Sequence, residues 1–119
     1  MLNVYGLKNC DSCRKALKWL TAEGIEHNFS DLRADGFDAK DLQRWLDVLG
    51  WEELINRRGT TWRNLDDAAT SGLDNKSAAK LIAENPALIK RPVFDNGGTG
   101  SDDVFVGFKT EQQNRLKAL

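Results

Sequence analysis

The sequence predicts a single domain with an α/β fold. Three observations support this prediction: a strand–helix–strand pattern at the start of the chain, a run of helical segments in the middle, and two short strands with a helix at the end. A chain of 119 residues suits one domain, for which about 100–200 residues is usual.

The first third alternates between extended and helical patterns. Residues 2–5 (LNVY) favour a strand, which Gly6 ends. Residues 25–32 (IEHNFSDL) predict a second strand. Between them, residues 11–23 place apolar side chains at the spacing of one helix face: Cys13, Ala16, Leu17 and Leu20. A strand, a helix and a strand in this order form a parallel βαβ unit.

Helical patterns fill the middle of the chain. Residues 38–49 and 74–85 predict amphipathic helices, and shorter helices are expected at 51–56 and 61–69. Pro86 ends the last of these helices, because proline lacks the backbone N–H that a helix interior needs.

The last third predicts a hairpin followed by a helix. Residues 91–94 (RPVF) and 103–108 (DVFVGF) are short strand-like runs, and the Gly-rich stretch DNGGTGSD between them reads as the hairpin loop. Thr110 stands three positions before Gln113, which is the capping-box spacing, and predicts the start of a helix that continues to the last residues.

Composition excludes several function classes. The formal net charge of −1 gives no electrostatic basis for direct binding of nucleic acid or of an anionic membrane. No run of about 18 apolar residues is present, so no membrane-spanning helix is predicted. The opening MLNVYGLKNC lacks the apolar core of an export signal, which predicts a cytoplasmic location. A permanent structural disulfide is not expected in such a reducing compartment.

Both cysteines lie in the stretch NCDSCRK, residues 9–15. A disulfide between Cys10 and Cys13 would close a very small loop and would add little stability. A structural zinc site normally takes four Cys or His ligands, and the sequence adds only His27 to these two, so no metal site is predicted. Cys13 lies on the apolar helix face, where it is either part of the core or a resolving thiol.

Cys10 lies just before the predicted first helix, where free backbone N–H groups favour an anion. Arg14 adds a positive charge one turn later. Such surroundings can lower the pKa of a thiol from near 8.5 to roughly 3.5–7.5. A C-x-x-C motif beside a βαβ pattern is a redox signature, and the alternative is inert packing of the two thiols. We therefore predict that Cys10 is a nucleophile.

Three further arginines are candidates for binding an anionic substrate. Arg57 and Arg58 lie in INRRGTT, and Arg91 precedes Pro92 in KRPV. Each alone would be an ordinary solvated charge, but the guanidinium group offers a planar set of donors that matches carboxylates and oxyanions. These side chains would form a site only if the fold brings them close to Cys10.

Three blocks of sequence resemble one known family. The blocks, in chain order, are CDSCRKALKWL, NRRGTTWRNLD and IKRPVF. Together they resemble the arsenate reductase ArsC/Spx family, most closely its YffB-like branch. The resemblance extends over essentially all of residues 1–119. It implies a thioredoxin-like fold, a mixed β-sheet flanked by helices, with an all-helical insertion at about 34–90. It also implies a cis peptide bond before Pro92, close to the active cysteine.

The resemblance also assigns roles to residues. Cys10 matches the catalytic cysteine, Arg14 the arginine four positions later, and Arg91 the arginine before the proline. Arg57 best matches the arginine of the middle block, although a shift of one residue would select Arg58 instead.

The YffB-like branch implies a glutathione-dependent thiol reductase, with glutathione as cosubstrate and no bound cofactor. Its partners would be glutathione or a mixed-disulfide substrate, with glutaredoxin as a further candidate. The alternatives are a glutaredoxin-coupled arsenate reductase and an Spx-like redox sensor that binds RNA polymerase. Two departures weigh against arsenate reduction: DVFVGF lacks an arginine that such reductases carry after the proline, and GLKN replaces their H-N-P-A form before the cysteine.

Overall fold

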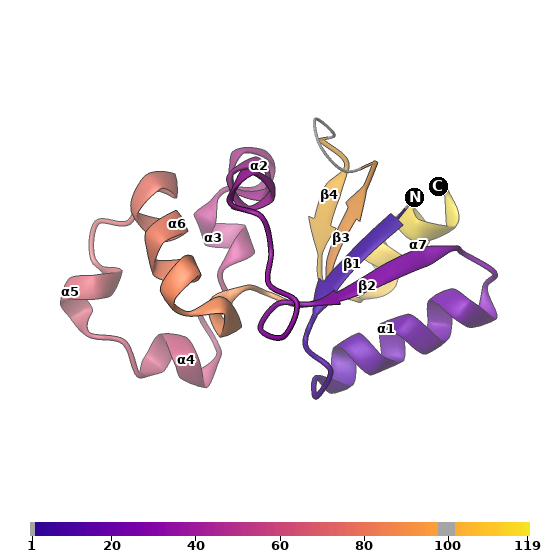
Figure 1. Ribbon diagram of the computed structural model, residues 1–119, viewed down its shortest axis with the longest axis horizontal. Helices are drawn as coiled ribbons and strands as arrows, with labels where there is room; N and C mark the ends of the chain where they lie inside the picture. The colour runs from indigo at the N-terminus through magenta and orange to yellow at the C-terminus, as the bar shows by residue number, and fades with distance from the viewer. Residues whose placement is uncertain (1, 98–101) are drawn as a thin grey trace.

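A computed structural model describes residues 2–97 and 102–119, and the protein divides along its long axis into a sheet half and a helical half. The long axis measures 45 Å, against 29 and 26 Å for the other two. In Figure 1 the sheet lies on the right with one helix below it and another behind it, and the remaining helices lie together on the left.

The sheet has four strands in the order β2-β1-β3-β4. Their bounds are β1 Leu2–Gly6, β2 His27–Asp31, β3 Val93–Asn96 and β4 Val104–Val106. β1 and β2 run parallel, with Gly6 opposite Asp31, and the other two pairings are antiparallel. The predicted α/β fold with a mixed sheet is therefore confirmed.

Side chains of alternate residues enter two separate cores on the two faces of the sheet, as the period of a strand requires. On one face Phe94 and Phe105 pack with α1 (Asp11–Ala22) and α7 (Thr110–Lys117). On the other face their neighbours Val93 and Val104 pack against the helical half. Both faces of the sheet are therefore covered.

The helical half lies between β2 and β3. Its elements are α2 Ala39–Leu49, α3 Trp51–Leu54, α4 Thr60–Arg63, α5 Asp67–Thr70, α6 Asn75–Glu84 and the 3-10 helix η1 Pro86–Leu88. Two aspartates cap the longer helices: Asp38 accepts a hydrogen bond from the Lys40 N–H, and Asp74 accepts one from the Ser77 N–H. Such caps satisfy N–H groups that have no partner inside the helix.

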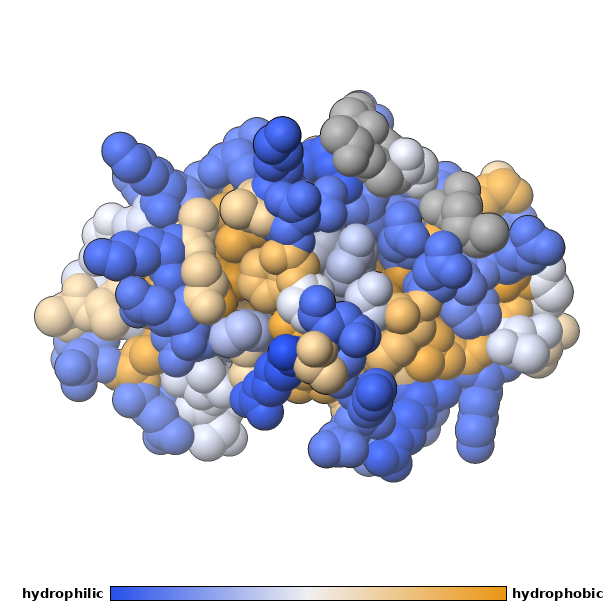
Figure 2. All heavy atoms as spheres, viewed as in Figure 1, coloured by the Kyte–Doolittle hydropathy of each residue, from blue (hydrophilic) through white to orange (hydrophobic). Residues whose placement is uncertain are grey.

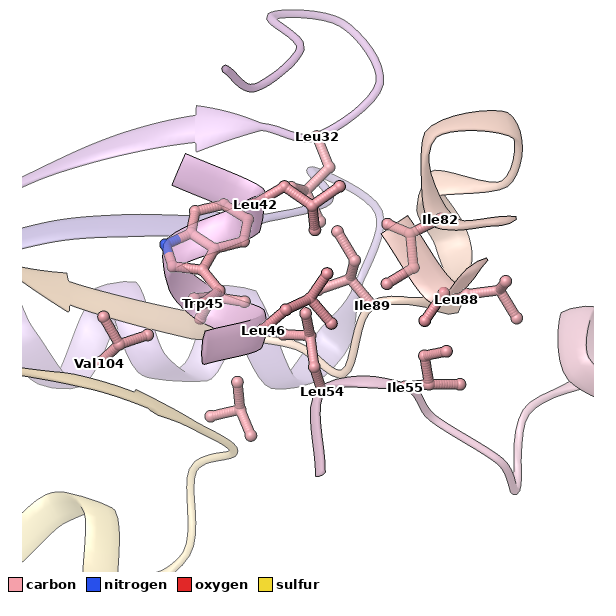
Figure 3. Packing of buried hydrophobic residues seen from close by; sticks show 13 residues of the cluster. Leu32, Leu42, Trp45, Leu46, Leu54, Ile55, Ile82, Leu88, Ile89 and Val104 are labelled. Carbon is pink, nitrogen blue, oxygen red and sulfur yellow. The ribbon is translucent and has the colours of Figure 1, made fainter. Parts of the chain in front are cut away.

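A buried polar cluster joins the helical half to the sheet. The Trp45 ring packs among leucine and isoleucine side chains of the helical half (Figure 3), while its Nε1 donates to Asp95 on β3 at 2.9 Å. The Arg44 guanidinium donates to both oxygens of Asp95, at 2.8 and 2.6 Å. Asp95 is only 1% exposed, so these partners compensate for the burial of its charge.

The surface is mainly polar. Figure 2 shows hydrophilic side chains over most of one face, with apolar side chains visible between them over both halves. Within the described ranges, the large hydrophobic residues classed as exposed are Val48 and Leu119. No helix in residues 2–97 or 102–119 combines the length and apolar character that crossing a membrane requires.

Several predicted boundaries in the helical half were wrong. The helix expected over 61–69 is divided into α4 and α5, because Asp66 begins a new turn with its carbonyl accepting from the Ala69 N–H. The helix expected over 51–56 ends at Leu54, since Ile55 adopts an extended conformation and pairs with Ile89.

The C-terminal third also differs in detail. β3 begins at Val93, not at residue 91, and the Arg91–Pro92 bond before it is cis, which confirms that expectation. The cap of α7 lies one residue earlier than predicted, because the Gln112 side chain accepts from the Lys109 N–H at 2.9 Å. The predicted hairpin loop includes residues 98–101, which lie outside the described residues.

Candidate functional site

Cys10 is the N-cap residue of α1, at the point where the chain turns from the sheet into the helix. Its backbone N–H donates to the Leu7 carbonyl at 3.1 Å, and its carbonyl accepts the Arg14 N–H at 3.0 Å. The residue is half-buried and its thiol is free. The predicted position at the helix N-terminus is therefore the position in the structure, where an anionic sulfur is favoured by the helix dipole.

The surroundings of the Cys10 sulfur favour its ionised form. Partial burial disfavours the thiolate, but it is outweighed by hydrogen bonds from the Cys13 backbone N–H and the Cys13 thiol, and then by the charge and hydrogen bond of Arg91. Together they lower the pKa of Cys10 below its ordinary value. Since the thiolate is the nucleophilic form of cysteine, this position suits a reactive thiol.

Cys13 has the opposite character. Its side chain is 1% exposed, and a methyl group added at Gly6 would overlap its sulfur, so a residue without a side chain is needed there. Burial, only partly offset by the Leu7 backbone N–H, raises the pKa of Cys13 to about 11. The predicted inward direction of Cys13 is confirmed, and the residue stands beside Cys10 as a protonated hydrogen-bond donor.

Arg91 reaches the cysteine from the other end of the sequence. It is half-buried, and its Nη1 donates to the Ala87 carbonyl at 3.1 Å. The cis Arg91–Pro92 bond lies against the end of β4, since the Pro92 carbonyl accepts the Gly107 N–H at 3.0 Å. The fold thus brings Arg91 to Cys10, as an anion site beside the thiolate requires.

The guanidinium of Arg14 is directed elsewhere. Its Nε donates to the Lys8 carbonyl at 3.0 Å, and its Nη1 lies 3.8 Å from Asp11. The side chain is 59% exposed. The charge that lowers the pKa of Cys10 therefore comes from Arg91, which the fold places there, and not from the arginine four positions after the cysteine.

A cleft of about 760 Å³ opens beside this site between the helical half and the sheet half. Arg91 lines it together with Arg57 and Arg58, and so does Ser12 in the first turn of α1, two residues after Cys10. The Arg57 guanidinium lies over the Trp51 ring, 5.6 Å from its centroid. The sequence left the choice between Arg57 and Arg58 open, and both residues line the cleft.

A short antiparallel bridge explains why these distant segments meet. Ile55 pairs with Ile89, with the Asn56 N–H donating to the Leu88 carbonyl and the Lys90 N–H donating to the Leu54 carbonyl, both at 2.7 Å. The bridge joins the segment before Arg57 to the segment before Arg91. Spacing in the sequence gave no indication of this pairing.

The cleft also contains charged residues that sequence reasoning missed. Its further basic residues are Lys15, Lys90 and Lys109, and its acidic residues are Glu52, Glu53 and Glu111. Lys15 and Lys90 lie inside or next to the recognised blocks, which is the signal that could have found them. With the three arginines, the cleft lining has an excess of positive charge.

The remaining candidate ligand, His27, lies on β2 with its Nδ1 2.9 Å from the Ile25 carbonyl. Across residues 2–97 and 102–119, no three His, Cys, Asp or Glu side chains are grouped so that they could hold a metal ion.

Comparison with known proteins places the chain in a family. The sequence model of the ArsC family matches residues 5–116. This chain belongs to the ArsC family. The recognition made from the three sequence blocks is therefore confirmed.

Two solved structures are similar over nearly the whole chain. The YffB protein is 38% identical with a TM-score of 0.87, covering 98% of each chain. An arsenate reductase (ArsC) related protein from Brucella melitensis is 39% identical with a TM-score of 0.76, covering 99% of this chain and 95% of that one.

Curated relatives are similar over most of the chain. An uncharacterized protein of Haemophilus influenzae is 45% identical over 112 residues, which cover 94% of this chain and 95% of that protein. The global transcriptional regulator Spx of Enterococcus faecalis is more distant, at 30% identity over 98% of this chain and 86% of that protein.

Proposed function

We propose that this ArsC-family protein is a thiol–disulfide oxidoreductase that uses the Cys10 thiolate as nucleophile and glutathione as cosubstrate. The observation that carries the proposal is the position of the Cys10 sulfur. It receives hydrogen bonds from Cys13 and lies beside Arg91, which also lines a cleft with more basic than acidic residues.

The reaction proceeds by two thiol–disulfide exchanges. The Cys10 thiolate attacks the glutathione sulfur of a mixed disulfide, forms a bond to it, and releases the other sulfur as a thiolate that takes up a proton. A second glutathione, as its thiolate, then attacks the same glutathione sulfur. This step releases oxidised glutathione and restores the Cys10 thiolate. In the net reaction the mixed disulfide and one free glutathione give the substrate thiol and oxidised glutathione, so one disulfide is exchanged for another.

The cleft suits the charges of glutathione. A glutathionyl group carries two carboxylates and one ammonium group, and the cleft offers Arg57, Arg58 and Arg91 to the carboxylates. The acidic residues Glu52 and Glu53, which also line the cleft, would accept hydrogen bonds from the ammonium group. A cosubstrate of this kind would lie along the cleft with its sulfur at Cys10.

Arsenate reduction is the second candidate, and family membership favours it. Arsenate would need several donors around the thiolate, and Arg91 is the arginine that the structure places there. Strand β4 and the two residues after it, 104–108, contain no arginine. The site therefore supports disulfide exchange better than arsenate reduction.

Mass spectrometry after exposure to oxidised glutathione tests the proposal. We expect one glutathionyl group on the wild type and none on Cys10→Ser, whereas Cys13→Ser should still be modified at Cys10. Absence of the adduct from the wild type, or its persistence in Cys10→Ser, would end the proposal.

Two parallel assays separate the alternatives. Arsenate-dependent oxidation of NADPH in the presence of glutaredoxin, above the level of Cys10→Ser, would favour arsenate reduction. Co-purification with RNA polymerase, combined with no glutathionylation, would favour an Spx-like regulator.

A further inference from the structure

We propose that Asp31 is a positioning residue for Cys10: its buried carboxylate fixes the loop of residues 7–10 by accepting the Lys8 backbone N–H. The proposal rests on the proposed role of Cys10 as the nucleophile. It assigns a role to Asp31, a charged residue that no sequence motif identified.

Asp31 is the last residue of β2 and is 6% exposed. Its two carboxylate oxygens serve different segments of the chain. Oδ2 accepts the Lys8 N–H at 2.9 Å, whereas Oδ1 accepts the N–H groups of Arg33 and Ala34, both at 2.8 Å. The carboxylate therefore ties the loop that carries Cys10 to the turn that leads into the helical half.

Leu7 packs against the core of the helical half and its backbone N–H binds the Cys13 sulfur, but the middle of the loop has few other attachments. Lys8 and Asn9 are exposed, so no core packing holds them. The loop is closed locally by the Cys10 N–H bond to Leu7, and its start is held where the Leu32 N–H donates to the Gly6 carbonyl at 2.8 Å. Between these two points, the hydrogen bond from the Lys8 N–H to Asp31 joins the loop backbone to a segment that is distant in the sequence.

The orientation of this loop decides where the Cys10 sulfur lies. Cys10 must keep the N-cap conformation for the Cys13 N–H to point at its sulfur. The Lys8 carbonyl also accepts the Arg14 Nε at 3.0 Å, so the same residue joins the loop to the helix. Loss of the Asp31 contact would allow the peptide group of Lys8 to rotate. This rotation would loosen both the N-cap conformation of Cys10 and the contact between Lys8 and Arg14.

Charge alone gives the opposite expectation. A carboxylate near a thiol disfavours the thiolate, because like charges repel. If Asp31 acted on Cys10 only through its charge, removal of that charge would make Cys10 more reactive. If Asp31 acts by holding the loop, the same removal makes Cys10 less reactive. The sign of the effect therefore separates the two roles.

The substitution Asp31→Asn breaks the contact selectively. The amide oxygen can replace Oδ1 and keep the bonds from Arg33 and Ala34, but the amide NH2 would face the Lys8 N–H, donor to donor. Asp74→Asn is the matched control, because Asp74 also binds a backbone N–H with a carboxylate oxygen but belongs to the helical half, at the cap of α6.

The readout is the rate of Cys10 alkylation by iodoacetamide as a function of pH, which needs no substrate. We expect the rate at pH 7 to fall about three- to tenfold in Asp31→Asn, because a looser loop passes only part of the loss of a charged hydrogen bond on to Cys10, and to stay at the wild-type value in Asp74→Asn. An unchanged or faster rate in Asp31→Asn would overturn the proposal. An equal fall in both variants would do so too, since it would show general destabilisation.

A second variant removes the donor and leaves Asp31 intact. Synthetic residues 1–9, with Lys8 replaced by its α-hydroxy acid, can be joined to residues 10–119 through Cys10 by native chemical ligation and refolded as the full chain. The ester lacks the N–H but changes no side chain and no charge. We expect slower alkylation of Cys10 than in the ligated wild-type chain, and equal rates would refute the role of this bond. Because alkylation reports Cys10 itself, a failure of glutathione turnover alone would overturn the proposed function and not this inference.

Discussion

Replacement of Cys13 by alanine is expected to raise the pKa of Cys10, because the thiol of Cys13 donates a hydrogen bond to the Cys10 sulfur. Alanine keeps the Cys13 backbone N–H, which is the other contact that this position gives to the sulfur. Serine keeps a donor of similar size in the same place, so Cys13→Ser should resemble the wild type more closely than Cys13→Ala does.

The size of the shift follows from the partial exposure of Cys10. A hydrogen bond to a charged group contributes about 1.5–3 kcal/mol when it is shielded from water. Cys10 is half-buried, so water replaces part of the lost bond, and we expect the thiolate to lose about 1 kcal/mol. At about 1.36 kcal/mol for each pKa unit, the pKa of Cys10 should rise by about 0.7.

Alkylation by iodoacetamide over about pH 4 to 10 measures this pKa, since only the thiolate reacts. The midpoint for Cys13→Ala should lie above that of the wild type, with Cys13→Ser between them. An unchanged midpoint in Cys13→Ala would refute the donor role, as would identical midpoints in the two variants.

The same pair of variants tests whether Cys13 resolves the glutathione adduct. Burial is the largest cause that raises the pKa of Cys13, and it is also present in the Cys10–glutathione disulfide, so attack by Cys13 on that disulfide should be slow. We therefore expect the adduct to persist in the wild type until glutathione is added. Its rapid loss in the wild type, but not in Cys13→Ser, would show that Cys13 is a resolving thiol.

Two further substitutions test other contacts. Arg91→Met should raise the pKa of Cys10 and the KM for a glutathione mixed disulfide, whereas Arg14→Met should leave the alkylation midpoint unchanged; equal shifts would contradict the placement of Arg91 at the sulfur. Asp95→Ala should reduce the free energy of unfolding by about 3–5 kcal/mol, because it leaves the Arg44 guanidinium without the carboxylate that accepts two of its hydrogen bonds. Urea unfolding measures this loss, and a value below about 1 kcal/mol would show that the cluster contributes little.

Local patterns predicted the parts of the fold that depend on local forces. The apolar spacing of α1 identified the face that carries Cys13, and the position of Cys10 before that helix predicted its favourable environment for an anion. The cis bond before Pro92 came from the resemblance to the family, because no local pattern distinguishes it from a trans bond.

The parts that failed depend on contacts between distant segments. Arg14 is one helical turn from Cys10, which suggested a direct effect, but its guanidinium lies against Lys8 and Asp11. Arg91 reaches the same sulfur because β3 pairs with β1, and sequence spacing contains no information on that pairing. Asp31 fell inside the strand predicted over 25–32 and was not singled out, because its hydrogen bonds to backbone N–H groups leave no signature in a single sequence.

The bridge between Ile55 and Ile89 allows part of the helical half to vary without moving the site around Cys10. Its hydrogen bonds close residues 57–88 into a loop whose two ends are fixed next to each other, and the entropy of closing such a loop changes only slowly with its length. Helices α4 and α5, which bury no residue, can therefore be lengthened or shortened while the position of Arg91 relative to the Cys10 sulfur is kept. Selection could in this way alter which molecules the protein recognises without rebuilding the centre that reacts with them.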